Sequence, residues 1–131
     1  SDMTLIRCDW PDSALSPNSR SHYMQKHRAS AKYRHACETI AREQRVHKQI
    51  WPDGEIKVHL TFHPPTNAKR DDDNLEASFK SGRDGIADAM GVDDNRFKVT
   101  RSIGDKTKGG CVMVKIVTES IQSIQHLGGV S

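Results

Sequence analysis

The sequence has few aromatic residues and no long apolar run. Aromatic residues make up 5% of the 131 residues and apolar residues 34%, so the hydrophobic core must be modest. No segment approaches the roughly 18 consecutive apolar residues that a membrane-spanning helix needs, and no basic-then-apolar leader opens the chain. We therefore expect one cytoplasmic domain over residues 1–131, with no membrane partner.

Cysteine is also scarce, and the patterns of several common sites are missing. Cys8, Cys37 and Cys111 lie far apart and form no Cys-x-x-Cys pair. This odd, scattered set indicates reduced thiols rather than a disulfide framework or a cysteine-rich zinc site. The chain also lacks a Gly-x-x-x-x-Gly-Lys-Ser/Thr loop for nucleotide phosphates and the spacing of an EF-hand.

Charge is small in total but unevenly distributed. The net charge is +3, yet eight basic residues oppose two acidic ones between Arg20 and Lys48, a local net charge of +6. Acidic residues concentrate between Asp71 and Asp94. A basic segment beside an acidic cluster suits a metal-dependent enzyme that acts on a phosphate polymer.

The spacing of apolar residues predicts a mixture of strands and helices. Apolar and polar residues alternate over 56–63, the clearest strand in the chain. Apolar residues recur at helical spacing over 75–90, where Gly82 and Gly85 indicate close packing against a neighbouring element. The other expected elements are a strand over 4–10, a loop over 12–21, an amphipathic helix with a basic outer face over 30–49, strands over 97–103 and 111–117, and a helix over 119–127. This order predicts a small mixed α/β (α+β) domain, with helices packed on a mixed sheet of about four strands.

Three consecutive aspartates precede the second long helix. One acidic residue suffices to cap a helix N-terminus, and adjacent carboxylates repel one another unless a cation lies among them. Asp71 and Asp73, two residues apart in an extended segment, can face the same side, whereas Asp72 would point away as the cap or as a solvent-facing acid. Oxygen ligands without histidine or cysteine favour Mg²⁺, with Mn²⁺ as a substitute, over zinc.

A second acidic pair, Asp93 and Asp94, follows this helix and taken alone is typical of a turn. The intervening helix of about 17 residues would be about 25 Å long. Asp94 can therefore approach Asp71 and Asp73 only if the chain doubles back after the helix. Lys80 would share the Asp73 face of the helix, either pairing with Asp84 or contacting a phosphate.

These motifs together resemble the RusA family of Holliday junction resolvases, found in bacteria and their prophages. The similarity covers roughly residues 55–117. It is carried by Phe-His-Pro at 62–64, Lys-Arg-Asp-Asp-Asp-Asn-Leu at 69–75, Asp-Gly-Ile-Ala-Asp-Ala-Met-Gly-Val-Asp-Asp at 84–94 and Thr-Lys-Gly-Gly at 107–110. The resemblance implies a small homodimeric nuclease that binds four-way DNA junctions and cuts two opposing strands with Mg²⁺, in DNA recombination and repair.

The resemblance also assigns roles to individual residues. By position, it implies Asp71, Asp73 and Asp94 as catalytic metal ligands and Lys80 as the catalytic lysine. The family's lysine usually follows Asn-Leu within two residues, whereas this chain has Glu-Ala there and Lys80 about one helical turn later.

Basic residues near these acids and on the basic helix are expected to contact DNA phosphates or simply to face solvent. These candidates are Lys69 and Arg70 beside the acids, Lys32, Arg34, Arg42 and Arg45 on the helix, and Lys106 and Lys108 in the loop before the last strand. The alternatives are a nuclease for flaps or forks, a non-catalytic protein that binds branched DNA, and a metal-dependent phosphatase or nucleotide-processing enzyme. The missing Gly-rich loop counts against the last, and a carboxylate cluster that repels phosphate counts against the pure binder.

Overall fold

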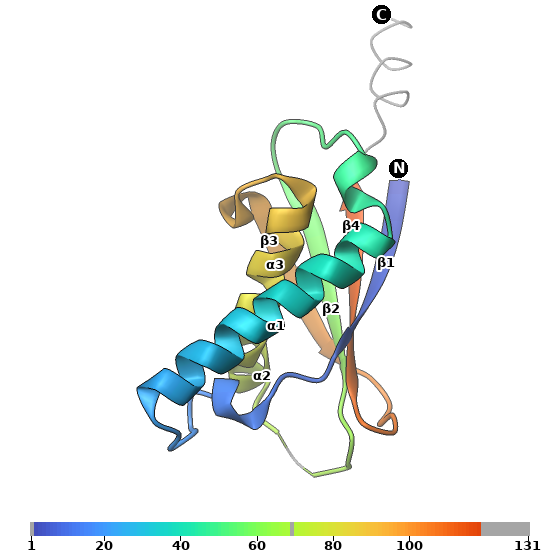
Figure 1. Ribbon diagram of the computed structural model, residues 1–131. Helices are drawn as coiled ribbons and strands as arrows, with labels where there is room; N and C mark the ends of the chain where they lie inside the picture. Colours follow the sequence, from blue (N-terminus) through green and yellow to red (C-terminus); the bar gives the residue numbers. More distant parts are fainter. Residues whose placement is uncertain (1, 69, 119–131) are drawn as a thin grey trace, which may run out of the picture.

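A four-stranded mixed sheet with three α-helices forms the described part of the protein, as the sequence predicts (Figure 1). The computed structural model describes residues 2–68 and 70–118. Its strands are β1 (Asp2–Asp9), β2 (Ile56–His63), β3 (Phe97–Ile103) and β4 (Cys111–Thr118), and its α-helices are α1 (Tyr23–Glu43), α2 (Asp72–Ser78) and α3 (Lys80–Met90). Short 3-10 helices are η1 (Ser13–Leu15), η2 (Val46–Lys48) and η3 (Asp94–Arg96).

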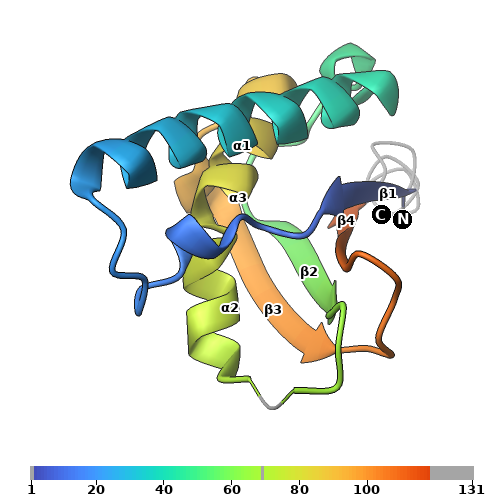
Figure 2. The same cartoon turned by 60° about the horizontal axis from the view of Figure 1, so that its bottom comes forward.

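The strands lie in the order β1-β4-β2-β3. β4 pairs antiparallel with both β1 and β2, whereas β2 and β3 are parallel. A parallel pair needs a long crossover connection, which α2 and α3 supply. Because of this crossover, α2 lies beside β3 at the edge of the sheet (Figure 2).

The hydrophobic core lies between one face of the sheet and the helices. Strand alternation buries Val58, Leu60 and Phe62 on this face, and α1 adds Tyr33 and Cys37. Ile56 is buried on the same face, whereas the alternate side chains of β2, at 57, 59, 61 and 63, are exposed or half-buried. The clearest predicted strand is therefore confirmed, with one face packed and one face open.

Glycine lets α3 approach α1 closely. A Cβ on Gly85 would lie 2.1 Å from the backbone oxygen of Arg34, and one on Gly82 would lie 2.8 Å from ring atoms of Tyr33 and Phe79. The close packing predicted from the two glycines is thus confirmed.

The helix boundaries differ from those predicted. The first helix starts at Tyr23, because His22 Nδ1 accepts a hydrogen bond from Met24 N at 3.2 Å and no glycine or proline follows until Pro52. It ends at Glu43, before Arg45 adopts a left-handed φ of 63°. The predicted loop over 12–21 contains η1, and the predicted helix over 119–127 lies outside the described residues.

The predicted helix over 75–90 is interrupted at Phe79 rather than continuous. The Phe79 ring is buried and lies edge-to-face on Tyr33 and Phe62, at centroid distances of 6.0 and 6.3 Å. Core packing of this ring coincides with the break. None of the helices in the described part of the chain combines the length and apolarity that a membrane crossing requires.

Candidate functional site

The three aspartates begin α2, and each has a different role. Asp71 is the N-cap, and its Oδ1 accepts hydrogen bonds from the backbone N–H of Asp73 at 2.8 Å and of Asn74 at 3.4 Å. Asp72 is exposed in the first turn. The prediction that Asp72 faces solvent is confirmed, but Asp71 is the cap, because it is the last residue with extended backbone (φ −87°, ψ 125°).

Asp73 binds an arginine from the edge strand. Its Oδ1 lies 2.5 Å from Arg101 Nη2, and Arg101 Nη1 also donates to Glu76 Oε2. Acceptance by Glu76 and the nearby charge of Asp73 raise the pKa of Arg101 above its ordinary value. β3 therefore supplies a fixed positive charge to the start of α2.

Lys80 connects the helix to the second acidic pair. Its Nζ lies 2.5 Å from Asp84 Oδ1 and 2.6 Å from Asp94 Oδ2. The pairing with Asp84 predicted from spacing is confirmed, and Asp94 returns to the helix because the chain reverses at Gly91, which has a left-handed φ of 72°. Desolvation alone would lower the pKa of Lys80, but its hydrogen bonds to the two carboxylates raise it. The hydrogen bond from Lys80 in turn lowers the pKa of Asp94.

Arg83 joins these two groups into one network. Its Nη1 lies 4.0 Å from Glu76 Oε1 and its Nε 3.9 Å from Asp94 Oδ2. We call this network the charged edge. Its members are Asp73, Glu76, Asp84 and Asp94, with Lys80, Arg83 and Arg101. Four acids against three bases leave it with a formal charge of −1.

The charged edge brings two of the three predicted metal ligands, Asp73 and Asp94, into one network. Asp71 joins them only through its hydrogen bond from the Asp73 backbone. Over residues 2–68 and 70–118, no three histidine, cysteine or acidic side chains are grouped as a metal site would require. The donor chemistry nevertheless fits Mg²⁺ or Mn²⁺, because these side chains offer carboxylate oxygens and already attract positive charge.

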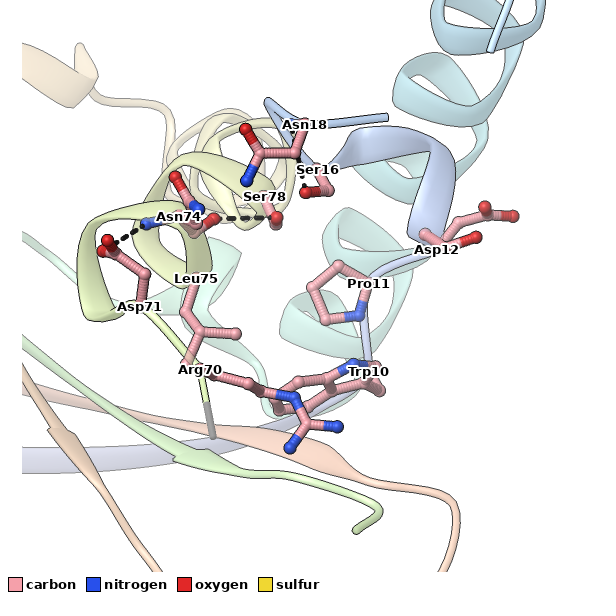
Figure 3. Close-up of a pocket in the computed structure, with 11 residues that line it drawn as sticks. Trp10, Pro11, Asp12, Ser16, Asn18, Arg70, Asp71, Asn74, Leu75 and Ser78 are labelled. Atoms are coloured by element: carbon pink, nitrogen blue, oxygen red, sulfur yellow. Dashed lines mark hydrogen bonds between the residues drawn. The ribbon is translucent and has the colours of Figure 1, made fainter. Parts of the chain in front are cut away.

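A cavity of about 380 Å³ opens beside Asp71 (Figure 3). Its lining includes Trp10, Asn18, Arg70 and Asn74. Arg70 lies over the Trp10 ring, 5.6 Å from its centroid. Sequence reasoning assigned no role to Trp10 or Asn18, because a loop of serine, proline and asparagine gives no sign of which later segment it will meet.

The basic residues expected to contact DNA fall into two groups. Arg34 is bound to Asp88 at 2.7 and 2.9 Å, and Arg42 to Glu38 at 3.0 Å, so both already have an acidic partner. Of the others, Lys69 lies outside the described residues, and four have exposed side chains: Lys32, Arg45, Lys106 and Lys108. Arg70 is half-buried at the cavity.

A further basic surface was missed by sequence reasoning. Lys57, Lys98 and Lys115 surround a hollow of about 390 Å³ on the open face of the sheet, together with His59. The two ring nitrogens of His59 lie 2.6 Å from Thr100 Oγ1 and 2.9 Å from Ser102 Oγ. The alternation of β2 already placed Lys57 and His59 on one face, but only the strand order brings the other two lysines beside them.

Comparison with known proteins relates the chain to a bacterial protein. No family model matches the chain. The chain is 35% identical over 127 residues to an uncharacterized protein of Xylella fastidiosa, in an alignment that covers 96% of this chain and 83% of that protein. The chain therefore belongs to the same family as this uncharacterized Xylella fastidiosa protein.

Proposed function

We propose that this protein is a Mg²⁺-dependent endonuclease that resolves four-way DNA junctions by cutting two opposing strands. The observation that carries the proposal is the charged edge, in which Asp73 at the start of α2 and Asp94 after α3 share one network of basic side chains. Structural capping needs only Asp71. The additional carboxylates therefore call for another reason, and metal-assisted phosphodiester cleavage supplies one.

In this proposal, Asp71, Asp73 and Asp94 hold the metal. A Mg²⁺ ion held there would supply positive charge to polarise the phosphate and to lower the pKa of a water molecule. Lys80 stays protonated because its carboxylate partners raise its pKa, and half of its side-chain surface is exposed. Lys80 thus offers a positive charge to the phosphate as negative charge develops on it.

A homodimer fits the proposed reaction. Two symmetric cuts in a two-fold junction need two sites related by a two-fold axis, and a C₂ dimer provides them. The exposed basic residues would hold the junction arms through their phosphates, so binding should weaken steeply with salt. The candidates for these contacts are Lys32, Arg45, Lys106 and Lys108 on exposed surface and Arg70 at the cavity.

The test is cleavage of a synthetic four-way junction beside a linear duplex of the same sequence, with Mg²⁺ and with EDTA. Asp73→Asn removes one proposed ligand, and Asp72→Asn is its matched control, because Asp72 is exposed in the same helical turn. We expect paired cuts in the junction only, lost with EDTA and reduced at least about 100-fold in Asp73→Asn. An Asp73→Asn protein that cuts as well as wild type would overturn the assignment.

A second candidate function is a non-catalytic protein that binds branched DNA. It is favoured by one observation: Arg101 and Lys80 already bind Asp73 and Asp94. This candidate predicts tight junction binding that needs no metal and produces no cuts. The same assay therefore separates the two, and replacing the junction with flap or fork substrates identifies a nuclease of different preference.

A further inference from the structure

The cavity beside Asp71 has an apolar side and a polar side. Figure 3 shows Trp10, Pro11 and Leu75 on one side and the amide groups of Asn18 and Asn74 on the other. Its volume, about 380 Å³, lies within the roughly 300–1,000 Å³ of small-molecule sites. The cavity can therefore accept a flat group with an apolar face and a polar rim.

Trp10 is held as a rigid platform in this cavity. Its ring meets Phe62 edge-to-face at a centroid distance of 6.2 Å, and Gly110 packs so closely that a Cβ there would lie 3.0 Å from Trp10. Arg70 lies over the ring and is itself fixed by donating to the backbone oxygens of Thr66 at 3.1 Å and Ala68 at 2.8 Å. Aromatic rings and arginine planes are the groups on which nucleic-acid bases stack.

The polar side of the cavity favours a neutral occupant with hydrogen-bonding edges. Among the described residues, the side-chain amides of Asn18 and Asn74 have no hydrogen-bond partner, and each can both donate and accept. Three charged residues line the cavity, and the two carboxylates of Asp12 and Asp71 outnumber the guanidinium of Arg70, so the lining disfavours a phosphate inside it. A nucleobase meets these conditions, whereas the phosphate of the same nucleotide must stay outside.

We propose that this cavity binds one unpaired nucleobase of a DNA strand, stacked beside Trp10 and Arg70. The inference rests on the proposed function for the identity of the polymer. Asp71 lines the cavity and also adjoins Asp73, so a base held here leaves the next phosphate of its strand near the charged edge. A paired base would have to leave its stack to enter, at an energetic cost. The cavity would therefore direct cutting to places where bases are already unpaired, as at a branch point.

The experiment measures fluorescence of Trp10 while a strand binds. The chain has two tryptophans, and Trp51 donates its Nε1–H to the backbone oxygen of Val46 in η2. A Trp51→Phe protein therefore reports on Trp10 alone. The probes are a short thymidine oligonucleotide and an abasic strand with the same number of phosphates. We expect the thymidine strand to quench Trp10 and to bind at least about fivefold more tightly than the abasic strand.

Three variants, at two positions, test the stacking and polar contacts separately. Trp10→Ala should remove the preference for the thymidine strand over the abasic strand, and Trp10→Phe should retain most of it. Asn18 is an exposed loop residue. Asn18→Ala should weaken binding of the thymidine strand and leave binding of the abasic strand unchanged. The Asn18→Ala variant keeps the test valid even where Trp10→Ala lowers the fraction of folded protein.

The outcomes separate this inference from the proposed nuclease. Equal affinity for the two strands, with Trp10 fluorescence unchanged, overturns the base site even when junctions are cut. If only the thymidine strand quenches Trp10 fluorescence and the protein does not cut DNA, the base site is supported and only the proposed nuclease activity is overturned. Loss of abasic-strand binding in Asn18→Ala also contradicts the inference, because the side chain would then act on the backbone.

Discussion

The helices α2 and α3, which connect β2 to β3, make two contrasting kinds of contact with the rest of the fold. Where α3 meets α1, contact is at backbone distance: Gly85 faces the Arg34 carbonyl directly, and Gly82 faces Tyr33 and Phe79. Where α2 lies beside the edge strand β3, charged side chains pair at the surface, as Arg101 does with Asp73 and Glu76. The Asp73 side chain is 82% exposed there, and that of Lys80 50%.

The two contacts should differ in how much they contribute to the stability of the fold. Close packing leaves no room for an added methyl group, so changes at the helix contact should cost several kcal/mol. Exposed ion pairs typically contribute about 0–1 kcal/mol. The exposed charges of the edge can therefore be altered with little loss of stability, so changes there can test the proposed metal binding without unfolding the protein.

Gly85→Ala should strongly destabilise the protein. The new Cβ would overlap the Arg34 backbone oxygen at 2.1 Å, and α1 would have to move away. We expect the free energy of unfolding to fall by about 3 kcal/mol, measured by urea denaturation. Gly82→Ala is the matched control, because its Cβ would meet side-chain atoms at 2.8 Å or more. A larger loss for Gly82→Ala than for Gly85→Ala would contradict this ranking.

The contact between α1 and α3 shows which features of the fold could be predicted from the sequence. Two glycines in an apolar stripe predicted close packing, and alternation over 56–63 predicted β2 with its bounds. The break at Phe79 could not be predicted, because it coincides with packing against Tyr33 and Phe62, residues distant in the sequence. Local spacing predicts a helix, but only tertiary contacts decide where it bends.

The charged edge shows the corresponding limit for the site. The acids and the pairing of Lys80 with Asp84 followed from spacing, but Arg101 did not. Arg101 reaches Asp73 only because β3 pairs in parallel with β2 and lies beside α2. Similarly, the cavity joins Trp10 and Asn18 to the start of α2 through the fold alone. The sequence predicted the chemical groups but not their partners from other strands and loops.

Substitutions of Arg83 test whether this residue stabilises the fold through its charge or through the burial of its aliphatic stem. Its ion pairs are long, 3.9 and 4.0 Å, but its side chain is only 21% exposed. We expect Arg83→Ala to lower the free energy of unfolding by about 1.5 kcal/mol through lost packing. Arg83→Met, which keeps an unbranched stem, should stay within about 0.5 kcal/mol of wild type. The free energy of unfolding is measured by thermal and urea denaturation. If Arg83→Met loses as much stability as Arg83→Ala, the charge of Arg83 stabilises the fold instead.

Metal binding should stabilise the protein through the edge alone. If Mg²⁺ binds the folded protein with a Kd of about 1 mM, 10 mM Mg²⁺ adds about 1.4 kcal/mol to the free energy of unfolding. The midpoint of thermal unfolding should rise in wild type and in Asp72→Asn, but not in Asp73→Asn. Magnesium-free buffer, brought to the same ionic strength with NaCl, is the control for screening. A rise that persists in Asp73→Asn would exclude that carboxylate as a ligand.

The smallest expected effect belongs to the ion pair that lies over the helix contact. Arg34 binds Asp88 with two hydrogen bonds, yet the side chains are 50% and 37% exposed. The pair should therefore contribute only about 0.5 kcal/mol at neutral pH, and Asp88→Asn should remove it. Asp53→Asn, at an exposed acid in the turn before β2, is the control.

The pH dependence of this pair has a definite sign. The hydrogen bond from Arg34 lowers the pKa of Asp88 in the folded protein. Its stabilisation is therefore complete above the unfolded pKa of about 3.9 and is lost as the pH falls through the lower folded value. The difference in unfolding free energy between wild type and Asp88→Asn should persist at pH 6 and vanish in strong acid. NMR titration of the Asp88 carboxyl checks the cause directly, and a midpoint at or above about 3.9 would show that the Arg34 contact does not hold in solution.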